Sequence, residues 1–312
     1  MADIVGAIWP VGQAGPVRPP LVASQLMSAT NETQEFARAP RPSSFNLVVT
    51  GIREIWSRRR LARYLVRADL VKTGADTVLG NVWWILDPLL QMLVYVVLVE
   101  IILGVKTPDY PLFVFCAILP WKWFTSSTND AISSVTSREK IIKQVQFPKI
   151  VLPLAATVSG IANFLFGLIP LAGLLLLFYA DRISINLLFV PLIAAVQFVF
   201  TLAVAVFLAG ANVFFRDLGN MARHLLRLWF YLSPALYTAD RYQAIQEKSR
   251  VVGAILNLNP WATLFESYHN AIFNRTAPDF IALGTVLISS LVLLAFATLF
   301  FKRVEPAFAK VL

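Results

Sequence analysis

The chain has 312 residues, of which 57% are hydrophobic and only 14% are charged, and its mean hydropathy is +0.67. That balance excludes an ordinary soluble globular domain and favours a polytopic membrane protein. The single cysteine, Cys116, excludes an intramolecular disulfide. A formal net charge of +9 also suits a nucleic-acid partner, so the positions of the positive residues decide what it means.

Residues 1–46 are rich in Pro, Ser, Thr and Ala and have no apolar period, which predicts a disordered, Pro-rich tail. They contain no basic stretch followed by an apolar one, so a cleaved signal peptide is not expected. Residues 52–72 are basic and partly amphipathic. They predict either a helix lying along the anionic membrane surface or an ordinary juxtamembrane positive cluster, and the sequence favours neither.

Six apolar stretches are long enough to cross a hydrocarbon core of about 30 Å as helices, which predicts an all-α membrane protein with both termini on one side. The expected spans are residues 81–104, 111–134, 150–180, 187–211, 220–238 and 280–302. Lys and Arg concentrate in the segments on the side of the termini, so that side is predicted to be cytoplasmic. The same distribution accounts for the net charge without a nucleic acid.

The second expected span is the least apolar, because residues 125–130 are polar. Its lower half must therefore face protein or water rather than lipid. Lys122 and Asp130 are eight residues apart, about two helical turns, which places both on one stripe.

Two connecting segments are more than plain loops. Residues 133–149 predict a short helix with Ser137 as a possible N-cap and Pro148 as a stop, suited to act as a mechanical handle for a partner; the alternative is a solvated basic loop. Residues 239–279 contain two short apolar elements separated by a break at Pro260. They fit two half-length elements dipping into the membrane, or a compact external helical hairpin.

No phosphate-binding G-x-x-x-x-G-K-[ST] loop occurs, so we expect no ATP hydrolysis by this chain and no catalytic residues. The two histidines, His224 and His269, lie in different segments and do not form a zinc motif, so no metal is expected either.

Several short motifs occur in a fixed order from about residue 47 to the C-terminus. They are Arg67-Ala-Asp69, Leu79-Gly80-Asn81-Val82-Trp83, Leu119-Pro120-Trp121-Lys122-Trp123-Phe124, Lys143-Gln144-Val145-Gln146-Phe147-Pro148-Lys149, Phe215-Arg216-Asp217, Leu232-Ser233-Pro234 and Asn259-Pro260. In this order the chain resembles an ABC-2 type permease of the polysaccharide-export family, which serves O-antigen, teichoic acid and capsule.

The resemblance implies a homodimer in the inner membrane that binds two ATPase subunits, which hold ATP and Mg, and a polyprenyl-linked glycan. It implies an interface helix before the first span, with the candidates Arg58, Arg59, Arg63, Arg67 and Asp69. It implies a cytoplasmic coupling helix, with the candidates Arg138, Lys140, Lys143, Gln144, Phe147 and Pro148. It also implies short re-entrant gate helices before the last span, with the candidates Asn259, Pro260 and Glu266.

Aromatic residues cluster near the expected span ends, where an interfacial belt is the ordinary explanation. In the family that the chain resembles, such rings also line a sugar channel, and the candidates here are Trp83, Trp123, Trp229, Phe230, Tyr231 and Tyr237. Arg216 and Asp217 are expected to shape a tight turn rather than to bind substrate.

The sequence therefore predicts the permease subunit of an exporter of lipid-linked polysaccharide such as O-antigen. Alternatives with the same fold are an exporter of a small lipid or drug, or of teichoic acid or capsule. A proton-coupled carrier would need ionisable residues deep in several spans and an inverted repeat, and neither is evident. A glycosyltransferase would need a carboxylate-rich loop, and the surroundings of Asp109 and Asp279 are too sparse.

Overall fold

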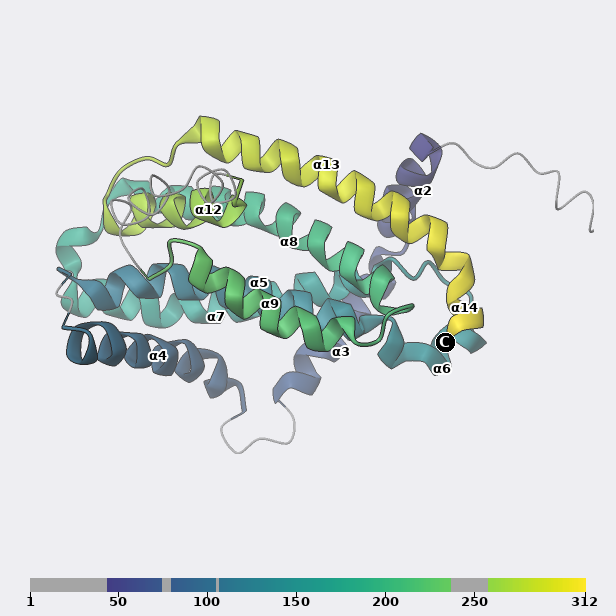
Figure 1. The fold of residues 1–312 in the computed structure, drawn as a ribbon, viewed down its shortest axis with the longest axis horizontal. Coiled ribbons are helices and arrows are strands. Elements are labelled where there is room, and N and C mark those ends of the chain that lie inside the picture. Colours follow the sequence, from purple (N-terminus) through teal and green to yellow (C-terminus); the bar gives the residue numbers. More distant parts are fainter. Residues whose placement is uncertain (1–43, 75–79, 105–106, 237–257) are drawn as a thin grey trace, which may run out of the picture. The chain divides into compact units, whose positions relative to one another are not determined.

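The computed structural model describes residues 44–74, 80–104, 107–236 and 258–312, and every regular element within these ranges is helical (Figure 1). The principal helices are α2 (Ser44–Ser57), α3 (Arg59–Gly74), α4 (Trp83–Val96), α5 (Tyr110–Ser134), α6 (Glu139–Gln144), α7 (Val151–Phe178), α8 (Val190–Asn212), α9 (Leu218–Leu232), α12 (Pro260–Tyr268), α13 (Phe280–Val304) and α14 (Phe308–Val311). Helix α4 continues as a π-helical turn, Val97–Ile102, and α12 continues as another, His269–Phe273. The predicted tail lies outside the described residues except for its last three, which begin α2.

Four helical stretches in the described ranges are long and apolar enough to cross a membrane. They are Trp83–Ile102, Val151–Phe178, Ile185–Asn212 and Phe280–Val311. They correspond to the first, third, fourth and sixth expected spans. The chain is therefore a multi-pass membrane protein by the length and composition of its helices.

Helix α5 is the centre of the bundle, although Lys122 and the polar run that follows it keep α5 out of those four. It packs against α4, α7, α8 and α9, and nearly all its apolar side chains are buried. Ser127 and Thr128 are fully buried as well. The polar half of this helix was predicted to face protein or water, and in the structure Ser127 and Thr128 face neighbouring helices while Asp130 is exposed.

Close contact between α5 and α7 depends on two glycines one heptad apart. A Cβ atom on Gly160 would lie 1.9 Å from Ser127 Oγ, and one on Gly167 would lie 2.6 Å from Leu119 Cδ2. Small residues at such positions let two helix backbones approach, which supplies the van der Waals contact that holds membrane helices together.

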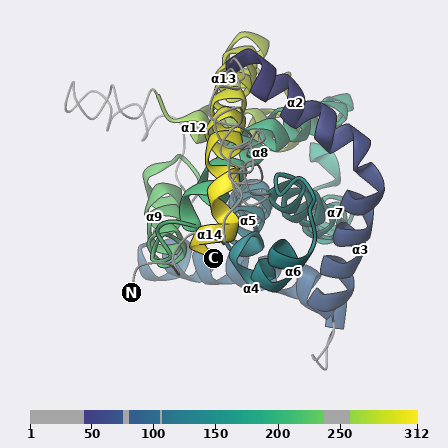
Figure 2. The ribbon, with the colours of Figure 1, turned by 90° about the vertical axis from the view of Figure 1, so that its right-hand side faces the viewer.

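The helices alternate in direction, so the bundle has two distinct ends (Figure 1). One end holds α6, α14 and the C-terminus, with α2 and α3 beside it, and we call it the α6 end. Figure 2 looks onto this end and shows α2 and α3 along one side of the bundle. The other end holds the start of α8 and of α13, with α12 nearby, and we call it the α12 end.

Three boundaries differ from the sequence expectations. Helix α9 ends at Leu232 rather than near residue 238, because Ser233 is extended before Pro234, and a residue that precedes proline disfavours the helical conformation. Helix α6 has Arg138, not Ser137, at its N-cap, because a 3-10 turn over Thr136–Arg138 precedes it. Helix α6 also ends at Gln144, four residues before Pro148, and continues into extended Val145.

Candidate functional site

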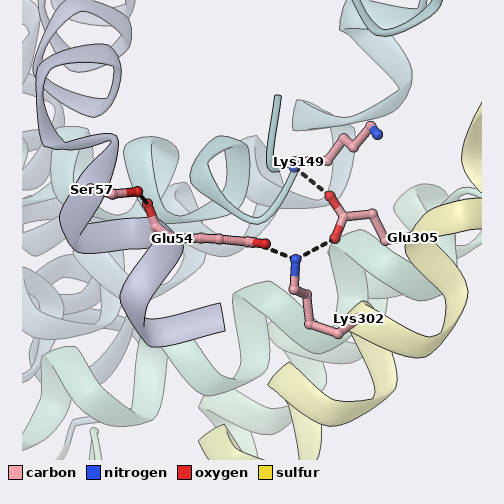
Figure 3. Close-up of polar contacts among 5 residues, drawn as sticks. All are labelled: Glu54, Ser57, Lys149, Lys302 and Glu305. Atoms are coloured by element: carbon pink, nitrogen blue, oxygen red, sulfur yellow. Dashed lines mark hydrogen bonds and ion pairs between the residues drawn. The ribbon is translucent and has the colours of Figure 1, made fainter. Parts of the chain in front are cut away.

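The α6 end contains a cluster of charges, Glu54, Lys149, Lys302 and Glu305, which we call the ion-pair cluster (Figure 3). The Lys302 ammonium lies between the carboxylates of Glu54 and Glu305, and its Nζ is 2.8 Å from Glu305 Oε2. The other oxygen of Glu305 accepts a hydrogen bond of 2.7 Å from the backbone N–H of Lys149. The cluster therefore joins α2, the end of α13 and the segment that leads into α7.

Both central side chains of this cluster are shielded from solvent. The side chains of Lys302 and Glu305 are only 8% and 10% exposed. A buried ammonium with two carboxylate partners is satisfied, whereas either carboxylate without Lys302 would carry an unpaired charge. Sequence reasoning missed this cluster, since Glu54 and Lys302 are 248 residues apart and each reads as an ordinary charge near a helix end.

The structure brings together one residue of the expected coupling helix and one of the expected interface helix. Arg138 Nη2 donates a hydrogen bond of 2.7 Å to Asp69 Oδ1 of α3, and Arg138 Nη1 donates to the backbone oxygen of Ser134. Both side chains are partly buried. The sequence motifs gave no sign of this contact, which joins α3 directly to the turn before α6.

The other coupling candidates divide into an outward and an inward group. Lys140, Lys143 and Gln144 are exposed, whereas Ile142 is buried and anchors α6. Lys143 donates a hydrogen bond of 2.6 Å to Glu139, and this bond holds the pKa of the Glu139 carboxyl below its ordinary value. Positive charge from nearby Arg216 acts in the same direction.

Phe147 and Pro148 belong to the inward group. Both are half-buried, and Phe147 packs against the hydrophobic cluster that includes Ile142, Val213 and Phe308. Its ring therefore contacts its own chain, in contrast to the lysines of α6, which point away from the bundle.

The arginines of the expected interface helix are exposed, whereas Asp69 is partly buried. Those that are exposed to solvent are Arg58, Arg59, Arg63 and Arg67. The opposite side of α3 packs on α7, and Leu65 contacts the buried cluster of the α6 end. The helix thus presents a basic face outward while one acidic residue ties it to the coupling segment.

Arg216 and Asp217 form the turn between α8 and α9, and both are exposed. The backbone oxygen of Asp217 accepts hydrogen bonds from the N–H groups of Asn220 and Met221. No ion pair joins the two side chains in the described part of the chain, so the turn is shaped by its backbone.

The aromatic candidates occupy different environments. Trp229 and Phe230 belong to an aromatic core, which we define as the packed rings Trp121, Phe124, Trp229, Phe230, Trp261 and Phe265. In this core the centroids of Trp121 and Trp261 are 4.8 Å apart, and those of Trp121 and Phe230 are 5.3 Å apart. Tyr231 is exposed on α9, and Tyr237 lies outside the described residues.

Trp83 and Trp123 line a cavity of about 310 Å³ between α4, α5 and α7. The ion pair between Lys122 and Asp87 lies in its wall, so Lys122 is partnered by α4 rather than by Asp130. The buried indole N–H of Trp123 has no hydrogen-bond partner. Asp130 lines a second cavity of about 540 Å³, next to Asp69 and Arg138, and Asn163 lies in the walls of both.

Among the gate candidates, Asn259 makes the contacts. Its side chain accepts hydrogen bonds from the backbone N–H of Trp261 and from Trp229 Nε1, at 3.1 and 2.9 Å, and donates one of 2.8 Å to Ser233 Oγ. It therefore caps α12 and ties it to the end of α9. Pro260 is the first residue of α12 and Glu266 is exposed, while the first expected gate element lies outside the described residues.

The described residues contain no group of three or more His, Cys, Asp or Glu side chains that could hold a metal ion. His269 is buried, stacks on Phe113 with ring centroids 4.0 Å apart, and contacts the Phe113 backbone oxygen through Nε2 at 3.0 Å. His224 is exposed on α9.

Comparison with known proteins gives a consistent result. No protein-family model matches the chain. It is 34% identical over 259 residues to the O-antigen export system permease protein RfbA of Myxococcus xanthus, which covers 83% of this chain and 98% of that relative. Two permeases of the same name from Klebsiella pneumoniae are 29% and 28% identical over 249 residues, covering 80% of this chain and 93% of each relative. The chain belongs to the family of O-antigen export permeases.

Proposed function

We propose that the chain is the permease subunit of an ATP-driven ABC exporter that moves lipid-linked O-antigen across the bacterial inner membrane. It works as a homodimer with two ATPase subunits, which bind ATP and Mg. The observation that carries this proposal is the similarity, over nearly the full length of the relative, to a permease named for O-antigen export. The membrane-type helices and the central, protein-shielded α5 agree with it.

In the proposed topology α4, α5, α7, α8, α9 and α13 each cross the membrane, and the α6 end is cytoplasmic. The alternating helix directions and the basic residues of α3 and α6 support this arrangement. Helix α9 has only 15 residues, about 22 Å, and is therefore shorter than a hydrocarbon core of about 30 Å. The short α12 is the described part of the proposed re-entrant gate.

Movement of α6 by the ATPase subunits opens the path for the glycan. The Arg138–Asp69 contact passes that movement to α3, and the ion-pair cluster passes it to α2 and α13. These contacts are charged and directional, so a displacement of the segment between α5 and α7 is transmitted to specific partners.

The test reverses the charges that face outward on α6. We expect the double variant Lys140→Glu, Lys143→Glu to lose at least tenfold of its ATPase-dependent O-antigen export, because an ATPase docking there meets repulsion. Arg275→Glu, a single charge reversal on an exposed residue at the α12 end, is the control, to be compared with the single variants Lys140→Glu and Lys143→Glu. Unchanged export by the α6 variant at matched membrane level would show that the exposed lysines of α6 do not contact the ATPase. Absence of O-antigen export by the wild-type permease with its ATPase would refute the function itself.

The aromatic path is tested with Ala and Leu replacements. Trp83 lines a cavity and Tyr231 is exposed, so if these rings contact sugar, both replacements should impair export. Phe230 is buried in the aromatic core, where Leu should largely rescue and Ala should lower protein yield. The measurement is the ratio of cytoplasmic to surface glycan at equal permease level, and full export by the Leu variants of Trp83 and Tyr231 would contradict the path.

A further inference from the structure

Helix α9 has a buried apolar face, an exposed apolar face made of Met221, Leu225, Leu228 and Leu232, and an exposed polar face between these two. Ala222, Leu226 and Phe230 are buried at intervals of four residues and fix the face that packs into the bundle. Away from that face lies an exposed set that we call the α9 stripe, Asn220, Arg223, His224, Arg227 and Tyr231. Its members recur at three- and four-residue spacing, so they form one line along the helix.

The cations of this stripe have no acidic partner. Within the described ranges no carboxylate lies within ion-pair distance of Arg223, His224 or Arg227. Arg223 donates one hydrogen bond to the side chain of Asn220, and the side chain of Arg227 makes no hydrogen bond to any residue that the structure describes. By contrast, Lys122, Arg138 and Lys302 each have a carboxylate partner.

The positions of the two exposed arginines along α9 bear on what these side chains contact. Arg223 and Arg227 lie about 8 and 14 Å along α9 from its first residue, at 1.5 Å per residue. An arginine facing lipid near mid-membrane costs about 2.5 to 3.5 kcal/mol on insertion scales. The exposed faces of α4 and α13 are apolar, for example Leu93, Val94 and Val292, and suit lipid. The two arginines are therefore suited to water, to the headgroup region or to an anion rather than to lipid tails.

The geometry favours a phosphate group. The two guanidinium groups are one turn apart, and guanidinium recognises phosphate oxygens in a bidentate manner. Side chains on a helix lean toward its N-terminus, so both arginines reach toward the α6 end. One turn farther along lies Tyr231, next to the Tyr95 and Phe230 rings, whose centroids are 5.8 Å apart. Cations thus precede rings along the same line.

We propose that the α9 stripe binds a phosphate group on the lipid side of the exported lipid-linked glycan, with Arg223 and Arg227 as the contacting residues. This inference rests on the proposed function and specifies which part of the substrate is recognised. The phosphate enters from the α6 end, and the sugars follow the exposed ring of Tyr231. An anionic phospholipid headgroup carries the same chemistry, so the experiment must separate the two.

The experiment measures binding of undecaprenyl diphosphate to the full-length permease in nanodiscs of phosphatidylcholine, with uncharged undecaprenol as the comparison. We expect the double variant Arg223→Gln, Arg227→Gln to bind the diphosphate at least tenfold more weakly, Arg227→Lys to be intermediate, and undecaprenol binding to be unchanged. Lys310→Gln, which removes an exposed charge on α14, is the control and should bind like the wild type.

Three outcomes would overturn the inference: wild-type affinity in the double variant, equal competition by phosphatidylglycerol, or a shift in oligomeric state caused by the double variant, which would make the stripe a contact between two copies. Export of O-antigen with the cognate ATPase is measured in parallel. Failure of the wild-type protein to export refutes the proposed function, whereas normal export by both wild type and double variant refutes only the role of the stripe.

Discussion

The ion-pair cluster and the aromatic core hold the same bundle together by opposite means. In the cluster a single ammonium group satisfies two carboxylates, and each partner comes from a different segment. In the aromatic core six rings from three helices, α5, α9 and α12, share many contacts, and no single polar group decides the packing. The difference teaches that the α6 end is sensitive to the loss of one charge, whereas the aromatic core can absorb a change in one ring.

That contrast suits the proposed mechanism. A joint made of charges transmits a displacement to defined partners and fails when one partner is absent. A core made of rings resists deformation because its contacts are numerous and individually small. In the proposed mechanism the α6 end, which receives the movement, therefore passes it to defined charge partners. The aromatic core around α9 and α12 stays rigid.

The largest effect is expected from Lys302→Met, which keeps the length of the side chain but removes its charge. The two carboxylates would then repel each other in a poorly hydrated site, at a cost of about 3 to 5 kcal/mol. Unfolding of the purified protein in mixed micelles with increasing SDS measures this free energy. Adding Glu54→Gln and Glu305→Gln to Lys302→Met should restore most of the stability. Equal instability of the triple variant would mean that packing, not charge, holds the cluster.

Asn259→Ala should have the next largest effect. The variant loses the N-cap of α12 together with the hydrogen bonds to Trp229 and Ser233, which amounts to about 1 to 3 kcal/mol. Asn259→Asp keeps the acceptor and should retain the cap but lose the donor to Ser233. Ser233→Ala is the matched variant for that single bond. If Asn259→Ala melts like the wild type, the connection between α9 and α12 carries no stability.

Trp261→Phe should cost about 1 kcal/mol despite the loss of half the ring system. The indole N–H of Trp261 is buried and has no hydrogen-bond partner among the described residues, so the replacement removes an unsatisfied donor while it opens a small cavity. The same SDS unfolding measurement, with near-UV circular dichroism to follow the core, checks the value. A larger loss of stability than in Lys302→Met would show that the aromatic core, not the ion-pair cluster, is the region more sensitive to a single substitution.

Much of the fold was predictable because a membrane-spanning helix requires a long run of apolar residues, which can be recognised in the sequence. Helices α4, α7, α8 and α13 each lie in a stretch that is long and apolar enough to cross a membrane. The surroundings of the polar half of α5 were predictable for a different reason, since a polar stretch within a membrane span cannot face lipid and must face protein or water. The end of α9 was not, because the apolar sequence continues past Leu232 and only the Ser233–Pro234 step stops the helix.

The contacts of the site were harder to predict. Arg138 and Asp69 each belong to a recognisable motif, but no pattern along the chain indicates that the two meet. The Asn259 side chain likewise contacts Ser233, which belongs to another motif 26 residues earlier in the chain. Hydrophobic periodicity predicts which face of a helix is buried, but it does not predict which residue of another helix a polar side chain contacts.

The smallest effect on stability, and a sharp one on transport, is expected at the Arg138–Asp69 pair. Both side chains are partly exposed, at 19% and 28%, so Asp69→Asn should change the free energy of unfolding by no more than about 1 kcal/mol. If the pair transmits movement from α6 to α3, the same change should lower export severalfold while leaving ATPase activity of the complex intact. The exchanged pair Asp69→Arg, Arg138→Asp restores the opposite charges and should recover part of the export. Loss of ATPase activity together with export in Asp69→Asn would instead show that the pair holds the docking surface in place, and the joint would then belong with the ion-pair cluster as a structural contact.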